Sequence, residues 1–134
     1  MIMSVAREVK NVGTVICIGE GSGISQIYPV AKEYKQAGNR IMGIIGGRSK
    51  DSIILEEEMK SVCDELFITT VDGSYGRKGK VSDVLKELFE VIEKSTHTKY
   101  PDLVYNIASA SMIKSVSELT SSYGIKAIAK EENV

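Results

Sequence analysis

The sequence predicts one α/β domain built on an open, mainly parallel sheet with helices on both faces. Short apolar runs rich in β-branched residues alternate with longer segments whose apolar residues recur at helical spacing. Five such runs and four helical segments fit into the 134 residues. Right-handed crossovers between parallel strands make such a sheet doubly wound. The predicted fold class is therefore a doubly wound α/β domain with a five-stranded sheet.

The expected strands are continuous apolar runs, as in parallel sheets that are buried on both faces. They lie at residues 14–18, 40–45, 65–70, 103–107 and 125–129. The first run leads into three closely spaced glycines, Gly19, Gly21 and Gly23, and a helical pattern then extends from about residue 25 to residue 36. Pro29 fits this helix only within its first turn, so a late helix start is predicted.

The remaining helices are predicted from caps and from apolar spacing. Asp51 is a candidate cap for a second helix with an apolar face of Ile54, Leu55, Met59 and Val62. The later two helices have one-sided apolar faces, formed by Val81, Val84, Leu85, Leu88 and Ile92, and by Met112, Ile113, Val116, Leu119 and Tyr123.

Composition excludes several classes of function. A formal net charge of -1 indicates no positive surface potential that would attract nucleic acid, so nucleic-acid binding is not expected. No apolar run approaches the roughly 20 residues that span a bilayer, and no signal peptide is visible, so no membrane partner is expected. Cys17 and Cys63 are isolated, which is typical of reduced thiols in a cytoplasmic protein and not of a disulfide framework or a metal site.

Ligands of doubly wound sheets bind beyond the carboxyl ends of the strands. Four predicted loops converge there, at residues 19–25, 46–50, 72–79 and 108–111. The first loop, which includes Ile24, offers backbone donors and a helix N-terminus that favour a phosphate. Arg48 and Lys50 offer positive charge, and Ser109 and Ala110 are small enough to leave room for a flat ring. A nucleotide cleft is the leading hypothesis.

The same residues permit a plainer interpretation. Gly19, Gly21 and Gly23 could serve only tight packing between a strand and a helix, and Glu20 would repel a phosphate if it faced the ligand. No catalytic residues are predicted, because His97 is the only histidine and has no recognisable partner. No cluster with metal-ligand spacing occurs either.

Several motifs resemble one protein family. They are Gly-Glu-Gly-Ser-Gly-Ile at residues 19–24, Tyr-Pro-Val-Ala-Lys at 28–32, Gly-Gly-Arg-Ser-Lys-Asp at 46–51, Leu-Glu-Glu-Glu-Met at 55–59 and Thr-Thr-Val-Asp-Gly-Ser-Tyr-Gly-Arg-Lys-Gly-Lys-Val at 69–81. Together they resemble the NAD(P)-binding domain of ferredoxin–NADP reductase-like flavoproteins. The nearest branch is the small subunit of NADH-dependent ferredoxin:NADP oxidoreductase, also called sulfide dehydrogenase, with the dihydroorotate dehydrogenase electron-transfer subunit as a relative.

This resemblance implies strand order 3-2-1-4-5 and a module that positions NAD(P)H for hydride transfer to FAD. The pyrophosphate would lie against Gly21, Ser22 and Gly23, and the adenosine end would meet Arg48. Asp72, Gly73 and Ser74 would border the same cleft. The resemblance implies FAD and an iron–sulfur cluster on segments that this chain lacks. Its partners would be an FAD-binding domain, and a larger flavin and iron–sulfur subunit with ferredoxin.

The sequence also departs from the family pattern. Glu20 replaces a loop glycine, and Ser109-Ala110 replaces a Gly-Pro near the nicotinamide. Residues 1–12 are expected to be the remnant of a linker from a preceding FAD-binding domain, and residues 13–134 the NAD(P)-binding domain. The chain is then an excised domain, inactive without its flavin. The alternative is a non-catalytic nucleotide sensor or assembly subunit with a degenerate cofactor loop.

Overall fold

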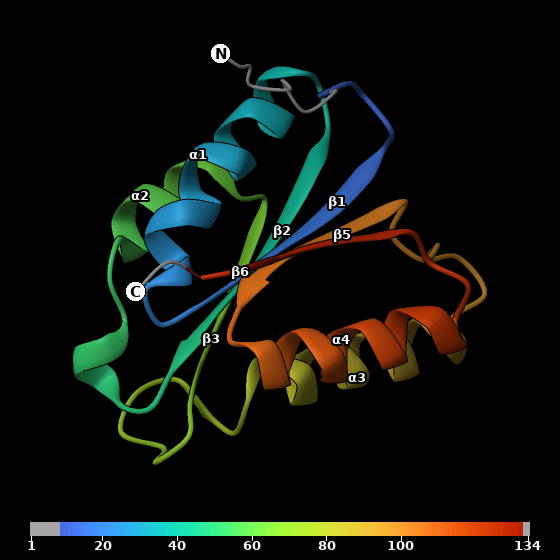
Figure 1. Cartoon of the computed structure of the whole chain (residues 1–134). Helices are drawn as coiled ribbons and strands as arrows, with labels where there is room; N and C mark the ends of the chain where they lie inside the picture. The colour runs from blue at the N-terminus through green and yellow to red at the C-terminus, as the bar shows by residue number, and fades with distance from the viewer. Residues whose placement is uncertain (1–8, 133–134) are drawn as a thin grey trace.

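The computed structural model describes residues 9–132 and contains a parallel sheet with helices on both faces (Figure 1). The strand order is β4-β3-β2-β1-β5-β6. The strands are β1 (Thr14–Glu20), β2 (Arg40–Gly47), β3 (Glu65–Thr70), β4 (Arg77–Lys78), β5 (Leu103–Ala108) and β6 (Ala127–Glu131). The helices are α1 (Gly23–Gln36), the 3-10 turn η1 (Lys50–Ser52), α2 (Glu56–Val62), α3 (Val81–Glu93) and α4 (Ala110–Ser122).

The predicted fold class and strand order are confirmed, and the strand count needs one correction. The five expected strands appear as β1, β2, β3, β5 and β6, and their order in the sheet is β3-β2-β1-β5-β6. The sixth strand, β4, consists of only two exposed residues that pair with Thr69 and Thr70. A pair this short and polar has no apolar pattern, so the sequence did not reveal it.

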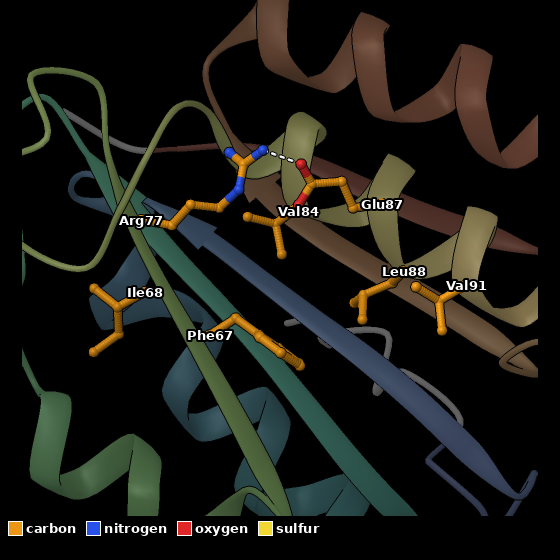
Figure 2. A pocket seen from close by; sticks show the side chains of 7 residues that line it. All are labelled: Phe67, Ile68, Arg77, Val84, Glu87, Leu88 and Val91. Carbon is orange, nitrogen blue, oxygen red and sulfur yellow. Dashed lines mark hydrogen bonds and ion pairs between the residues drawn. The ribbon is translucent and has the colours of Figure 1, made fainter.

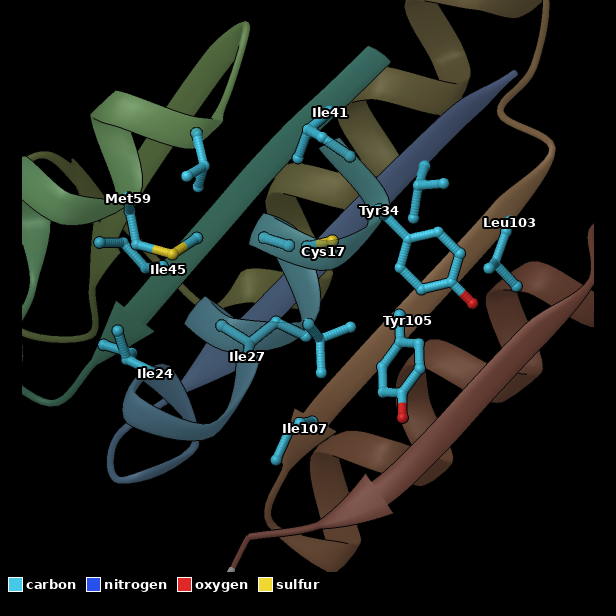
Figure 3. Packing of buried hydrophobic residues seen from close by; sticks show 14 residues of the cluster. Cys17, Ile24, Ile27, Tyr34, Ile41, Ile45, Met59, Leu103, Tyr105 and Ile107 are labelled. Atoms are coloured by element: carbon cyan, nitrogen blue, oxygen red, sulfur yellow. The ribbon is translucent and has the colours of Figure 1, made fainter. Parts of the chain in front are cut away.

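Alternating side chains of the central strands divide the core between the two faces. Val15 and Cys17 point toward α1 and α2, whereas Ile16 and Ile18 point toward α3 and α4. Figure 3 shows the α1 side, where Ile27 and Tyr34 of α1 pack in one cluster with Cys17 and Tyr105 of the sheet. Each fully buried aliphatic side chain contributes about 1.5–3 kcal/mol to folding, so β1, with both faces covered, anchors the site at its carboxyl end.

Helix α1 begins earlier than expected. It starts at Gly23, so Pro29 lies inside the helix and not in its first turn. The prediction of a late start was wrong because it considered only the proline. Ser25 is hydrogen-bonded at the N-terminus of the helix, where its amide and its hydroxyl both donate to the Ser22 carbonyl. Pro29 is exposed, so water can reach the helix carbonyl that lacks a donor there.

The second predicted helix begins later than Asp51. Asp51 lies in η1, and Leu55, with a left-handed φ of 55°, separates this turn from α2. Met59 and Val62 are buried as predicted, but Ile54 lies outside the helix and is 41% exposed. The left-handed backbone conformation of Leu55 cannot be predicted from the spacing of apolar residues.

Residues 9–12 lead into β1 without helix or strand. The buried side chain of Asn39 holds this lead-in, since its Oδ1 accepts from the amides of Val12 (2.8 Å) and Gly13 (3.0 Å). Residues 1–8 of the expected linker lie outside the described residues, and the domain boundary at residues 12–13 stays a prediction.

Candidate functional site

A cleft opens at the carboxyl ends of β1, β2 and β5, between the strands where the chain switches from one side of the sheet to the other. Strand β1 has β2 on one side and β5 on the other, so the loops after these strands diverge there. The cleft encloses about 370 Å³ and is lined by Glu20, Gly21, Gly47, Arg48, Ser52, Val71, Ser109 and Glu132.

The glycines of the β1–α1 loop are required by packing. A Cβ at Gly19 would lie 2.6 Å from Ile27 Cγ2, and one at Gly23 would lie 2.3 Å from the Ile107 carbonyl oxygen. Gly21 has a left-handed φ of 59°, and its amide donates to the Gly46 carbonyl at 2.9 Å. The packing interpretation of these glycines is therefore supported, and the same close approach places the N-terminus of α1 at the cleft.

Two carboxylates lie in the cleft. Glu20 Oε1 accepts from the Ser109 hydroxyl (3.0 Å) and amide (3.2 Å), which ties β1 to the start of α4. Glu132 Oε2 accepts from the Gly23 amide at 3.3 Å. This amide belongs to the first residue of α1, where the helix dipole favours negative charge. The carboxylate of Glu132 thus accepts a hydrogen bond from an amide that was expected to bind a phosphate.

The two predicted cations behave differently. Arg48 lines the cleft, and among residues 9–132 no hydrogen bond or ion pair engages its guanidinium group. Lys50 lies outside the cleft lining, with its Nζ 5.6 Å from the centre of the Tyr75 ring. Arg48 is therefore the positive group that remains available to an anion in the cleft.

The 71–79 loop is held mainly by its own hydrogen bonds and by η1. The Ser74 amide donates to Asp72 Oδ1 at 2.9 Å, and Ser74 Oγ accepts from the Lys50 amide at 2.8 Å. The Ser74 side chain and amide lower the pKa of Asp72 by stabilising its carboxylate. The Tyr75 hydroxyl contacts both carboxylate oxygens of Glu56 at 2.7 and 2.8 Å, and this contact lowers the pKa of Glu56 and raises that of Tyr75.

The structure brings only some predicted site residues into the cleft lining. Gly21, Arg48 and Ser109 line it. Gly19, Gly23 and Ile24 are buried beside it, and Ser22 and Ala110 are exposed at the starts of α1 and α4. Lys50 belongs to η1, and Asp72, Gly73 and Ser74 belong to the 71–79 loop beside it. None of these four residues lines the cleft.

Five lining residues were not among the predicted site residues: Glu20, Gly47, Ser52, Val71 and Glu132. Gly47 lies in the predicted loop at residues 46–50 and Val71 directly follows a predicted strand end, so these positions could have identified both residues. Glu132 lies in a charged tail, and nothing in the local sequence indicates that it folds back onto a loop 109 positions away.

Other cavities suit an anionic ligand less well. An apolar groove of about 240 Å³ lies between β3 and α3 (Figure 2). Its lining consists of Phe67, Ile68, Arg77, Val84, Glu87, Leu88 and Val91. Arg77 forms an ion pair with Glu87, so the groove has no free cation. His97 lines a cavity of about 480 Å³ that also contains Thr14 and Arg40, at the amino ends of the strands.

Metal-ligating side chains and cysteines are the remaining reactive groups within residues 9–132. No group of three or more His, Cys, Asp or Glu residues in this part of the chain could hold a metal ion. Cys17 and Cys63 are free thiols, and burial raises the pKa of each of them. No helix in the described part of the chain is long and apolar enough to cross a membrane.

Comparisons with known proteins identify relatives of the domain. No family model matches the sequence. A dihydroorotate dehydrogenase B (NAD(+)) electron transfer subunit homolog of Thermotoga maritima is 45% identical over 82 residues, which are 61% of this chain and 29% of that protein. A probable electron transfer subunit of the same enzyme from Methanopyrus kandleri is 30% identical over 118 residues, 88% of this chain and 42% of that protein. The chain thus spans less than half the length of each of these two relatives.

Solved structures share the fold. The C-terminal domain of PF1911 hydrogenase from Pyrococcus furiosus aligns over 97% of this chain and 100% of that domain, with a TM-score of 0.74 and 22% identity. A chain of NADH-dependent reduced ferredoxin-NADP oxidoreductase aligns over 91% of this chain and 41% of its own length, with a TM-score of 0.74 and 34% identity. The chain is therefore homologous to part of the dihydroorotate dehydrogenase B electron-transfer subunits and shares the fold of these ferredoxin reductase-like structures.

Proposed function

We propose that this domain binds NAD(P)H in an oxidoreductase that uses flavin and iron–sulfur centres. The observation that carries the proposal is one cleft at the switch point that combines the N-terminus of α1 with the free guanidinium of Arg48. The relatives are named as NAD(+)-linked electron-transfer subunits and as an NADH-dependent oxidoreductase, which supports the same ligand class.

The residues present fit a dinucleotide in part. The turn at Gly21 and the first amides of α1 would meet the pyrophosphate, and Arg48 would meet the adenosine side, including a 2′-phosphate if one is present. Glu20 is turned toward Ser109 and shares its charge with two donors there. Glu132 is the remaining obstacle, because its carboxylate already holds the Gly23 amide.

The domain's task in this proposal is to bind and orient. When bound, the nicotinamide supplies a hydride, and hydride transfer requires no acid or base from the side chains. The acceptor would be FAD on an FAD-binding domain outside this chain. A larger flavin and iron–sulfur subunit and ferredoxin are the proposed partners beyond it. Positioning the nicotinamide within contact distance of the flavin is then the main contribution of the protein.

A second function is favoured by one observation, the presence of two carboxylates and one guanidinium among the cleft-lining side chains. This local excess of negative charge disfavours a pyrophosphate and suits a nucleotide sensor or assembly subunit without hydride transfer. The two functions differ in whether a dinucleotide binds and whether its hydride reduces the flavin of the full protein.

The test is thermal unfolding with NADH, NADPH, AMP or no ligand. A ligand at about 100 times its Kd stabilises by about 2.7 kcal/mol, which raises the Tm of a domain of this size by roughly 10 °C. The variant Arg48→Ala should lose most of the NADPH-induced shift, and Lys50→Ala, which removes a neighbouring cation outside the cleft, should retain it. No shift with any of the nucleotides at millimolar concentration would refute the proposal.

A further inference from the structure

The chain carries its own anion at the proposed phosphate position. Glu132 follows β6, and its amide donates to the Ala108 carbonyl at 2.9 Å, which fixes its backbone beside β5. From there its side chain reaches the first amide of α1, at Gly23. A Cβ added at Gly21 would lie 3.5 Å from Glu132 Oε2, so the carboxylate lies directly against the glycine turn.

The position of this carboxylate disfavours a second anion at the start of α1. Helix α1 has 14 residues, and no acidic side chain of its own lies in the first turn. Glu132 therefore supplies the negative charge that this end of the helix favours. A phosphate oxygen that approached the Gly23 amide would displace the carboxylate or would lie beside it, at a cost in charge repulsion.

We propose that Glu132 is a tethered competitor of the dinucleotide, which leaves the α1 N-terminus when a pyrophosphate binds. This inference rests on the proposed function and adds a regulation of the same cleft. Because Glu132 directly follows β6, the exchange links occupancy of the cleft to the C-terminal end of an edge strand whose residues are mostly exposed. The contact between Glu132 and the Gly23 amide then stabilises the ligand-free domain and weakens its affinity for the dinucleotide.

The effect of Glu132 on the dissociation constant of a dinucleotide follows from the contact that the ligand must displace. A carboxylate at a helix N-terminus, held by one charged hydrogen bond, resists displacement enough to change a dissociation constant by about tenfold. Neutralising it by Glu132→Gln should therefore tighten binding of a dinucleotide about tenfold. The matched control is Glu131→Gln, which removes the same charge one residue earlier, from an exposed side chain of β6 outside the cleft lining.

The experiment is isothermal titration calorimetry of the whole chain and both variants with NADH, NADPH and inorganic pyrophosphate at fixed ionic strength. We expect Glu132→Gln to bind about tenfold more tightly and Glu131→Gln to stay within about twofold of the parent protein. Glu132→Ala, which also removes the hydrogen bond to Gly23, should show at least the same gain. The amide NMR signal of Gly23 should shift in both Glu132 variants and stay in place in the control.

The outcomes separate the two proposals. Equal or weaker dinucleotide binding by Glu132→Gln, relative to Glu131→Gln, would overturn the competitor role and leave the proposed function intact. If Glu132→Gln bound pyrophosphate more tightly than the parent protein but no variant bound a dinucleotide, Glu132 would compete with pyrophosphate only, and the proposed function would fail. Absence of binding by all variants and all three ligands would overturn both.

Discussion

Gly23→Ala tests the close approach of α1 to β5 that forms the cleft. A Cβ at this position would lie 2.3 Å from the Ile107 carbonyl oxygen and 3.0 Å from its carbonyl carbon. Both atoms belong to the backbone of a strand in the middle of the sheet, so no side-chain rotation can relieve the overlap. The start of α1 must move away from β5.

The expected loss of stability is the difference between two opposing terms. Overpacking of this kind costs about 3 kcal/mol at the upper end of the usual range. Replacing glycine by alanine in a helix returns about 1 kcal/mol of helix propensity. The free energy of unfolding of the variant should therefore be about 2 kcal/mol lower than that of the parent, which lowers the Tm by roughly 7 °C for this chain length.

Urea unfolding followed by circular dichroism measures this difference directly. Lys32→Ala, on the exposed side of the same helix, should change stability by less than about 0.5 kcal/mol. Helix propensity alone predicts the opposite sign for Gly23→Ala. A variant as stable as the parent, or more stable, would therefore refute the packing argument.

Three further outcomes follow from buried or paired groups. Burial and the Asp64 charge raise the pKa of Cys63 to about 11, so at pH 8 iodoacetamide should alkylate it roughly 100-fold more slowly than a free thiol of pKa 9.0; an equal rate would contradict this. Asp64 accepts from the Ile41 amide at 2.8 Å, and this bond lowers the pKa of its carboxyl group below 3.8. Asp64→Asn should therefore cost about 1 kcal/mol at pH 7, a difference that is present above pH 3.8 and disappears as the pH falls through the lowered pKa, whereas a pH-independent loss would contradict the charged contact. Asn39 is 2% exposed and makes four hydrogen bonds to backbone groups, so Asn39→Ala should cost about 3 kcal/mol by urea unfolding, and a loss below about 1 kcal/mol would show that water replaces these bonds.

The sheet could be predicted from the sequence because its central strands are buried on both faces. Runs such as Val15 to Ile18 are then apolar without interruption, and the pattern alone identifies them. The start of α1 and the short strand β4 could not be predicted in this way. One depends on hydrogen bonds at Ser22 and Ser25, and the other on a pairing of two exposed residues.

The candidate site could be predicted to the level of loops and not of side chains. Arg48 was expected at the cleft because the loops after parallel strands share one edge of the sheet, and it lies there. Lys50 was expected on the same grounds, yet its amide bonds to Ser74 and its side chain lies over Tyr75. Whether a loop side chain enters the cleft depends on contacts between loops, and the spacing of residues within one loop does not predict these contacts.

The central position of β1 has a consequence for synthesis on the ribosome. One edge of β1 pairs with β2, which follows about 20 residues later, but the other edge stays unpaired until β5 has been synthesised. The contact between the Thr14 amide and Asp102 joins residues 88 positions apart. Until β5 emerges, β1 has an open edge although its central residues are apolar, and chains released early would associate through this edge. The strand order that forms the cleft therefore also means that the open edge of β1 is covered only when β5 pairs with it.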